Sequence, residues 1–224
     1  MSLCTIVGAG PGLGASLMRR FAREDYRVAI LGRRTAILES VLQSDPARGE
    51  NCRSFAADAG RPTSIADAFR AVTDWAGETD VLIYNAAVLK ERLASKLTAG
   101  HMASDMAVNL GGALSAIGQV LPAMRRRGRG TVLLTGGSLA FEPMPAWAAL
   151  GASKAALRNF SLALGQEVRP DGVHVAMIQI CGRIEAGGFY DPDRIADAYW
   201  LLHKEKPEAF RAEVIYRPEA EPAP

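Results

Sequence analysis

The sequence has few cysteines, and their spacing is not that of a metal site or a disulfide framework. Cys4, Cys52 and Cys181 form no Cys-x-x-Cys pair and no spacing with histidine that is typical of zinc ligands. An odd number of scattered cysteines favours a reducing compartment. We therefore expect no bound metal. We interpret Cys181 as an inert, partly buried thiol, the alternative being a position near a cofactor.

The sequence also lacks a strong charge excess and long apolar runs. The formal net charge is only +2, and no aromatic or basic stripe extends the basic run at residues 125–129 toward a nucleic-acid groove. We interpret this run as a solvated helix end. No apolar run approaches the roughly 18 residues needed to cross a bilayer, and the first apolar segment leads into glycines instead of a signal cleavage site. We expect a cytoplasmic protein without nucleic-acid or membrane partners.

Short apolar runs alternate along the chain with longer segments of helical period. The hydrophobic fraction of 49% excludes a disordered chain, and 224 residues suit one large domain. The alternation predicts an α/β fold with a doubly wound parallel sheet, covered by helices on both faces. We expect one nucleotide-binding domain over residues 1–224, with a fraying end at residues 220–224. The seven predicted strands are residues 3–7, 28–31, 54–57, 81–84, 131–135, 173–180 and 213–216.

Glycines dominate the turn after the first predicted strand, where residues 8–14 read GAGPGLG. Glycines let backbone amides approach a pyrophosphate, whose charge would lie at the positive end of the following helix. The run lies between a strand and a helix, which is the context that this motif requires. We therefore predict a dinucleotide site and not a plain turn. The predicted contacts are Gly8, Gly10, Pro11, Gly12, Leu13 and Gly14.

The end of the second predicted strand indicates which nucleotide is preferred. Folds that prefer NAD usually carry an Asp or Glu there, which accepts hydrogen bonds from the ribose 2′-hydroxyl. This strand ends in Gly32-Arg33-Arg34, without a carboxylate. Two guanidiniums attract a 2′-phosphate through charge-assisted bonds, so we predict NADP(H) as the cofactor, with NAD less favoured. The alternative is that Arg33 and Arg34 only begin an exposed helix.

The strand order and the glycine turn resemble the short-chain dehydrogenase/reductase family along essentially the whole chain. Gly8, Gly12 and Gly14 fall on the Gly-x-x-x-Gly-x-Gly turn of that family. The resemblance implies a Rossmann fold and further cofactor contacts. Asp58 is similar to the family's adenine-contacting Asp, and residues 85–87 are similar to its Asn-Ala-Gly segment. The additional contacts implied are Asp58, Ala59, Asn85, Ala86, Ala87 and Lys154.

Three residues match the catalytic set of that family. Asn109 matches a mid-helix Asn that supports the catalytic Lys through water, and Ser138 matches the Ser that hydrogen-bonds the substrate oxygen. Lys154, within Ser153-Lys154-Ala155-Ala156, matches the Lys that holds the nicotinamide ribose. Each residue also has a structural alternative: Asn109 could bridge backbone in a bent helix, Ser138 could belong to a turn, and Lys154 could be a surface charge.

The proton donor of the family is missing from this sequence. That donor is a Tyr four residues before the Lys, where this chain has Leu150. Loss of a general acid typically costs ~10² to 10⁴-fold in rate, so the usual chemistry should be badly impaired while cofactor binding need not suffer. Tyr190 and Tyr199 are two alternative donors, although we interpret Tyr199 as core and Tyr190 as loop. Residues 183–191 also form only a short connection, which implies an open or shallow substrate pocket.

Three functions remain open at this point. The first is an oxidoreductase acting on a small carbonyl or alcohol, and the retained Asn109, Ser138 and Lys154 favour it. The second is an NADP(H)-binding sensor or scaffold that has lost turnover, and the third is non-redox or alkene-reducing chemistry. The resemblance also implies a homodimer or homotetramer. A run of small residues allows close packing, either against a second copy or against the chain's own sheet: Ala107, Gly111, Gly112, Ala113 and Ala116.

Overall fold

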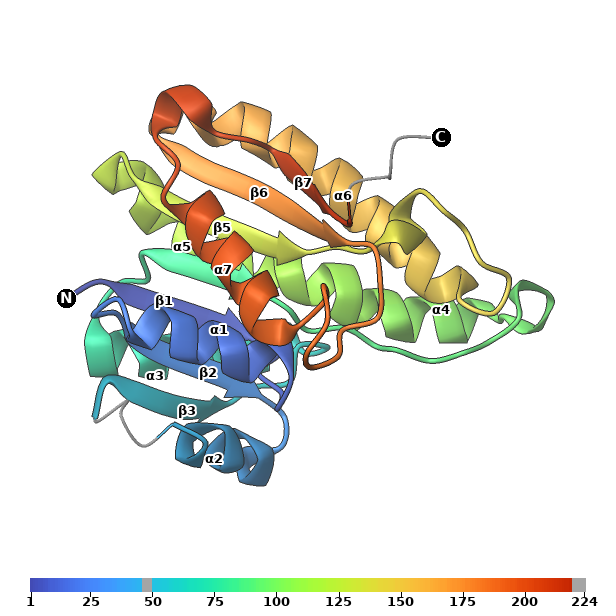
Figure 1. The fold of residues 1–224 in the computed structure, drawn as a ribbon, viewed down its shortest axis with the longest axis horizontal. Helices are drawn as coiled ribbons and strands as arrows, with labels where there is room; N and C mark the ends of the chain where they lie inside the picture. The colour runs from blue at the N-terminus through green and yellow to red at the C-terminus, as the bar shows by residue number, and fades with distance from the viewer. Residues whose placement is uncertain (46–49, 219–224) are drawn as a thin grey trace.

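A computed structural model describes residues 1–45 and 50–218 of the chain. Seven parallel strands form one sheet in the order β3-β2-β1-β4-β5-β6-β7, and helices cover both of its faces (Figure 1). This arrangement confirms the predicted doubly wound Rossmann-type fold. The expected fraying end at residues 220–224 lies outside the described residues. The strands are β1 (Leu3–Val7), β2 (Arg27–Gly32), β3 (Cys52–Ala56), β4 (Val81–Tyr84), β5 (Gly130–Thr135), β6 (Val173–Ile180) and β7 (Glu213–Tyr216).

The helices divide between the two faces of the sheet. Helices α1, α2 and α7 contribute to one buried cluster, and α3, α5 and α6 contribute to the other. Figure 1 shows α1 and α7 side by side over the near face. The helices are α1 (Leu13–Ala22), α2 (Thr35–Gln43), α3 (Pro62–Ala76), α4 (Ala99–Met106), α5 (Gly112–Arg127), α6 (Ala148–Val168) and α7 (Pro192–His203).

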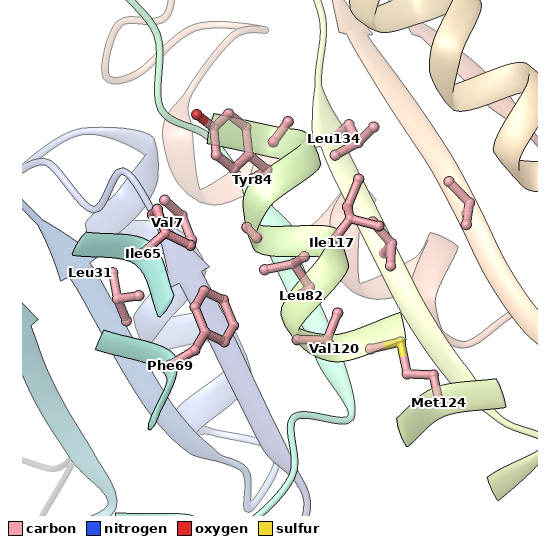
Figure 2. Packing of buried hydrophobic residues seen from close by; sticks show 14 of the residues in the cluster. Val7, Leu31, Ile65, Phe69, Leu82, Tyr84, Ile117, Val120, Met124 and Leu134 are labelled. Atoms are coloured by element: carbon pink, nitrogen blue, oxygen red, sulfur yellow. The ribbon is translucent and has the colours of Figure 1, made fainter. Parts of the chain in front are cut away.

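Alternate residues of the strands face the two helical layers, because successive side chains of a strand point to opposite faces. Leu31 and Leu82 face α3 and α5, where they pack with Phe69 and Ile117 (Figure 2). The neighbouring Ile30 faces the opposite layer with α1 and α7. Full burial of such a side chain contributes roughly 1.5–3 kcal/mol, so the two clusters hold the strand ends in register at the site.

The order in which strands are added to the sheet changes side between β1 and β4, although all strands are parallel. From β1 the chain adds β2 and then β3 on one side, crosses back, and adds β4 to β7 on the other side. The connections that leave the carboxyl ends of β1 and β4 therefore diverge to opposite faces. In open parallel sheets such a switch point leaves a crevice that binds ligands.

Residues 99–127 form one continuous helix that contains a π-helical turn at Ala107–Gly111. By length and composition alone this helix could cross a membrane, which corrects the expectation that no apolar segment is long enough. The expectation counted unbroken apolar runs, whereas here apolar residues keep the mean hydropathy high although a few polar residues interrupt them. Within the fold, Ala113, Ile117 and Val120 of α5 pack against the sheet, so the core accounts for this apolar face.

Candidate functional site

Two glycines of the turn allow the first strand, the turn and α1 to pack closely. Gly8 has a φ of +93°, and a Cβ there would lie 2.4 Å from the backbone nitrogen of Ala86. A Cβ on Gly14 would lie 2.6 Å from Cα of Ala9. Neither contact is tolerable, so both positions require glycine for the fold itself.

The other two glycines leave space in front of the helix. A Cβ on Gly10 or on Gly12 would meet no atom within 4 Å. Helix α1 begins at Leu13, and its first turn has no side-chain cap and no acidic residue. Ala15 N donates to Gly10 O at 2.9 Å, and the space in front of the turn lies at the positive end of the helix. This arrangement fits a pyrophosphate.

The first of two adjoining cavities extends from the glycine turn toward β2 and β3. Its volume is about 360 Å³, and Arg33, Arg34 and Asp58 lie in its wall. The two guanidiniums belong to exposed residues and form no ion pair with any residue of the described segments. Asp58 accepts a hydrogen bond from Gly60 N at 3.0 Å and pairs with Arg61 Nε at 3.3 Å. The wall thus presents free cations at one end and a fixed carboxylate beside them.

The second cavity lies over the carboxyl ends of β4, β5 and β6, with a volume of about 540 Å³. Ser138, Leu150 and Lys154 all line it. Asn85 and Ala87 line both cavities, so the two cavities adjoin along the switch point. Most of the second wall is apolar, with Leu13, Leu89, Leu139, Ile180 and Ile184 among its other residues.

Most of the predicted site residues line one of these two cavities, but three do not. Pro11 is an exposed turn residue, Gly14 is buried within the turn, and Asn109 is buried in the π-helical turn. The first cavity brings together Gly8, Gly10, Arg33, Arg34, Asp58, Ala59, Asn85, Ala86 and Ala87. The second brings together Gly12, Leu13, Asn85, Ala87, Ser138 and Lys154.

Lys154 is a buried cation at the floor of the second cavity. Its Nζ donates a hydrogen bond to the carbonyl oxygen of Thr135. No carboxylate among the described residues forms an ion pair with it. Burial therefore lowers the pKa of Lys154 to about 8. Thr135 Oγ1 donates to Asn85 Oδ1 at 3.0 Å, and Asn85 Nδ2 donates to Gly8 O at 2.9 Å. This chain of contacts connects the lysine to the glycine turn.

Asn109 connects the wall of the site to α6. Its Oδ1 accepts from the backbone nitrogen of Val88 at 2.7 Å, and its Nδ2 donates to Ser153 Oγ at 2.7 Å. Ser153 Oγ in turn donates to the carbonyl oxygen of Leu150 at 2.9 Å. The Asn109 side chain therefore fixes the segment after β4 against the turn of α6 that carries Leu150 and Lys154.

Neither alternative tyrosine reaches the second cavity. Tyr199 is fully buried, its hydroxyl lies 2.7 Å from Thr135 Oγ1, and burial raises its pKa. Tyr190 donates to the carbonyl oxygen of Cys181 at 2.8 Å. Cys181 itself lines the cavity, and its Sγ lies 3.3 Å from the carbonyl oxygen of Gln179. No phenol among the described residues lines the cavity that holds Ser138.

Gln179 supports the Ser138 loop and was not singled out in the sequence. Its Oε1 accepts from the backbone nitrogen of Gly137 at 2.6 Å, and its Nε2 donates to Glu213 Oε1 at 2.8 Å. Glu213 is held by Arg158 Nε and Nη2 at 2.6 and 2.8 Å. The signal in the sequence was a polar residue near the end of a mostly apolar strand.

Comparison with known proteins identifies the family. The model of the short chain dehydrogenase family matches residues 3–187, which is most of the chain. The chain belongs to the short-chain dehydrogenase family. It is 31% identical over 176 residues to oxidoreductase asL5 of Sarocladium schorii. The matched part is 77% of this chain and 68% of asL5.

Other proteins similar to this chain are about equally distant from it. The 3-dehydrosphinganine reductase TSC10B of Arabidopsis thaliana is 32% identical over 177 residues, and the matched part is 77% of this chain but only 52% of TSC10B. A metagenomic short-chain oxidoreductase in complex with NADP is 27% identical, with a TM-score of 0.88 and 98% of each chain covered. The family and its link to nucleotide-dependent oxidoreduction are therefore established, whereas relatives at this distance do not define a substrate.

Proposed function

We propose that this protein is an NADP(H)-dependent oxidoreductase that reduces a small carbonyl or oxidises the corresponding alcohol. One observation carries the proposal: Arg33 and Arg34 line one of two adjoining cavities, and Ser138 and Lys154 line the other. The glycine turn lies between them, as a pyrophosphate between two nucleoside halves requires. The NADP complex of the metagenomic relative also supports this cofactor.

The residues of each half would have distinct roles. Amides at the start of α1 would bind the pyrophosphate, and the guanidiniums of Arg33 and Arg34 would bind the 2′-phosphate. When bound, the nicotinamide supplies or accepts the hydride. Ser138 would donate a hydrogen bond to the substrate oxygen as negative charge develops there. Asn109 would hold α6 in place, and Lys154 would hold the ribose at the cavity floor.

The apolar wall supports a substrate whose body is apolar around the reacting carbonyl. Lys154 is the one charged side chain in the lining of the second cavity as far as it is described. Two large apolar side chains of this lining, Leu89 and Ile184, are also exposed to solvent. A substrate with a carboxylate near its carbonyl would meet no arginine in this lining, so we expect alkyl or aryl carbonyls to be preferred.

Leu150 favours a second candidate function, an NADP(H)-binding sensor or scaffold without turnover. An apolar side chain in place of the phenol leaves cofactor contacts intact while removing the usual acid. By family resemblance we also propose a cytoplasmic homodimer or homotetramer, built as a single nucleotide-binding domain. The small residues Gly112, Ala113 and Ala116 do not argue for it, since a Cβ on Gly112 would meet Tyr84 and both alanines are buried in the core.

Two measurements test the proposal. Calorimetry with NADPH and NADH should show binding of both nucleotides and a clear preference for NADPH. Absorbance at the NADPH band should then fall when aldehydes or ketones with apolar bodies are added, and Ser138→Ala should slow this reaction about 10²- to 10³-fold without weakening nucleotide binding. Binding without any turnover would favour the sensor, and absence of binding would refute both candidates.

A further inference from the structure

A carbonyl that accepts a hydride also needs a proton on its oxygen, and this site has lost the phenol that would give it. Ser138 can orient and polarise the oxygen, but a serine hydroxyl does not give up its proton at neutral pH unless a base removes it. Among the described residues that line the second cavity, the titratable side chains are Lys154 and Cys181.

Cys181 is poorly arranged as the donor. Its Sγ lies 3.3 Å from the carbonyl oxygen of Gln179, so the thiol proton points to the backbone. Burial, together with the nearby charge of Glu142, raises the pKa of this thiol. The thiol therefore holds its proton more tightly than an ordinary cysteine does.

Lys154 has the arrangement that a donor needs. It lies one turn after Leu150 on α6, and both side chains line the cavity that also holds Ser138. An ammonium carries three protons, and the hydrogen-bond acceptor for Nζ within the described residues is the carbonyl oxygen of Thr135. Nζ therefore retains protons that are not committed to the protein, at the floor of the cavity.

We propose that Lys154 is itself the proton donor, its ammonium giving a proton to the substrate oxygen in place of the missing phenol. This inference rests on the proposed oxidoreductase function. As the hydride adds to the carbonyl carbon, the π electrons of the C=O bond move to oxygen, and oxygen takes a proton from Nζ. Lys154 is left as a neutral amine, which regains a proton from solvent water. In alcohol oxidation the neutral amine takes the hydroxyl proton.

Burial supports this role, because the lowered pKa of about 8 lies close to neutral pH. An acid of this strength is mostly protonated at pH 7 yet gives up its proton more readily than a solvated lysine. Leu150 lines the same cavity one helical turn away, and its side chain offers the ammonium no hydrogen-bond acceptor.

The charged groups near α6 do not replace burial as the cause. Asp105 of α4 is paired with Arg92 at 2.8 Å, and Glu213 of β7 is paired with Arg158 at 2.6 Å. The other titratable groups that face this region are Tyr199 beyond Thr135, Cys181 after β6 and Glu142 after the Ser138 turn. Desolvation is the cause that lowers the pKa of Lys154.

The lysine can be titrated directly without relying on turnover. The sequence contains five lysines, so protein labelled with ¹³C-lysine gives few Cε resonances, and the one missing in Lys154→Met belongs to Lys154. In the protein saturated with NADP(H) we expect this resonance to titrate near pH 8 instead of near the ~10.4 of a solvated lysine. Titration above pH 10 would overturn the proposal.

Steady-state kinetics provide the second readout. For carbonyl reduction by the native chain, kcat should fall above about pH 8, and this limb should vanish in Lys154→Met together with at least ~10²-fold of the rate. The limb should remain in Cys181→Ser. A limb that survives in Lys154→Met, or that disappears in Cys181→Ser, would overturn the assignment to Lys154.

Failure of the proposed function gives a different pattern. In that case NADPH binds and Lys154 titrates near pH 8, but no carbonyl is reduced by the native chain or by Leu150→Tyr. That pattern would remove the reaction and with it the role of Lys154 as donor. Turnover by the native chain with a normal lysine titration would remove only the donor assignment.

Discussion

Leu150 and Lys154 lie one helical turn apart on α6 and line the same cavity as Ser138. Restoring a phenol at position 150 should therefore place a second acid beside the lysine. We expect Leu150→Tyr to raise kcat for carbonyl reduction by about 10²-fold, the low end of what a positioned general acid contributes. Leu150→Phe, which adds the ring without the hydroxyl, is the matched control. Equal rates in the two variants would contradict this expectation.

Gly12 and Gly14 provide a matched pair of substitutions within one turn. A Cβ at position 12 meets no atom within 4 Å, whereas one at position 14 lies 2.6 Å from Cα of Ala9. Gly12→Ala should therefore fold normally but lose nucleotide affinity, because its methyl group occupies the pyrophosphate space. Gly14→Ala should lose roughly 1–3 kcal/mol or more of unfolding free energy. Calorimetry and urea unfolding on both variants separate the two effects. Unchanged NADPH binding by Gly12→Ala would argue against pyrophosphate binding at the glycine turn.

Arg33 is expected to determine cofactor preference. Charge-assisted hydrogen bonds to a phosphate contribute about 1.5–3 kcal/mol each, so Arg33→Ala should weaken NADPH binding about 10- to 100-fold. Affinity for NADH should change little, since that nucleotide lacks the 2′-phosphate. Arg53 is exposed and lies outside both cavity walls, so Arg53→Ala is the control. An equal loss of affinity for NADPH and NADH in Arg33→Ala would refute a role of Arg33 in distinguishing the two nucleotides.

Burial of Lys154 makes stability depend on pH in a defined direction. Its pKa falls from 10.5 in the unfolded chain to about 8 in the fold, so between these values the unfolded chain binds more protons. Stability therefore rises with pH through that window. Below pH 8 the buried ammonium costs about 3 kcal/mol, at ~1.4 kcal/mol per pKa unit.

Lys154→Met should remove that cost. We expect the variant to be more stable than the native chain by about 3 kcal/mol at pH 7, with the difference shrinking as pH approaches 10.5. Urea unfolding at several pH values measures this, and the exposed Lys96→Met serves as a control without such an effect. A variant that is less stable at pH 7 would show that the ammonium is stabilised by contacts that the structure does not contain.

Gln179 should act on the reaction through the Ser138 loop. Replacing it by Met leaves the backbone nitrogen of Gly137 without its acceptor and removes the hydrogen bond to Glu213 Oε1. Small displacements of a positioned group can cost about 10²-fold in rate, so we expect kcat to fall about 10- to 100-fold with little change in NADPH affinity. Gln166→Met, at an exposed position of α6, should leave both unchanged. Loss of nucleotide binding in Gln179→Met would indicate a general loss of structure instead.

Much of the fold was predictable because its local signals agree with one another. The strands at Val173–Ile180 and Glu213–Tyr216 coincide with their predicted limits, since apolar β-branched runs bounded by turn residues leave little choice. Gly8 and Gly14 were predictable for a similar reason: a strand, a tight turn and a helix can meet this closely only where no Cβ is present.

Other parts of the site depend on contacts between distant residues. The pairing of Gln179 with Gly137 and Glu213 joins positions 34 and 42 residues apart, and no periodicity indicates it. The π-helical turn around Asn109 depends on hydrogen bonds to Val88 and Ser153. The apolar character of the helix over residues 99–127 was not apparent from unbroken apolar runs, because polar residues interrupt them.

The link from Glu213 to the Ser138 loop has a consequence for the order in which the site matures. Within residues 1–45 and 50–218, β7 is the last strand and pairs only with β6. During synthesis the nucleotide-binding half can therefore assemble before the loop that faces the substrate gains its final support. A chain that ends before β7 should still bind NADPH yet be unable to orient a carbonyl. Such a chain would bind the reduced nucleotide without using it.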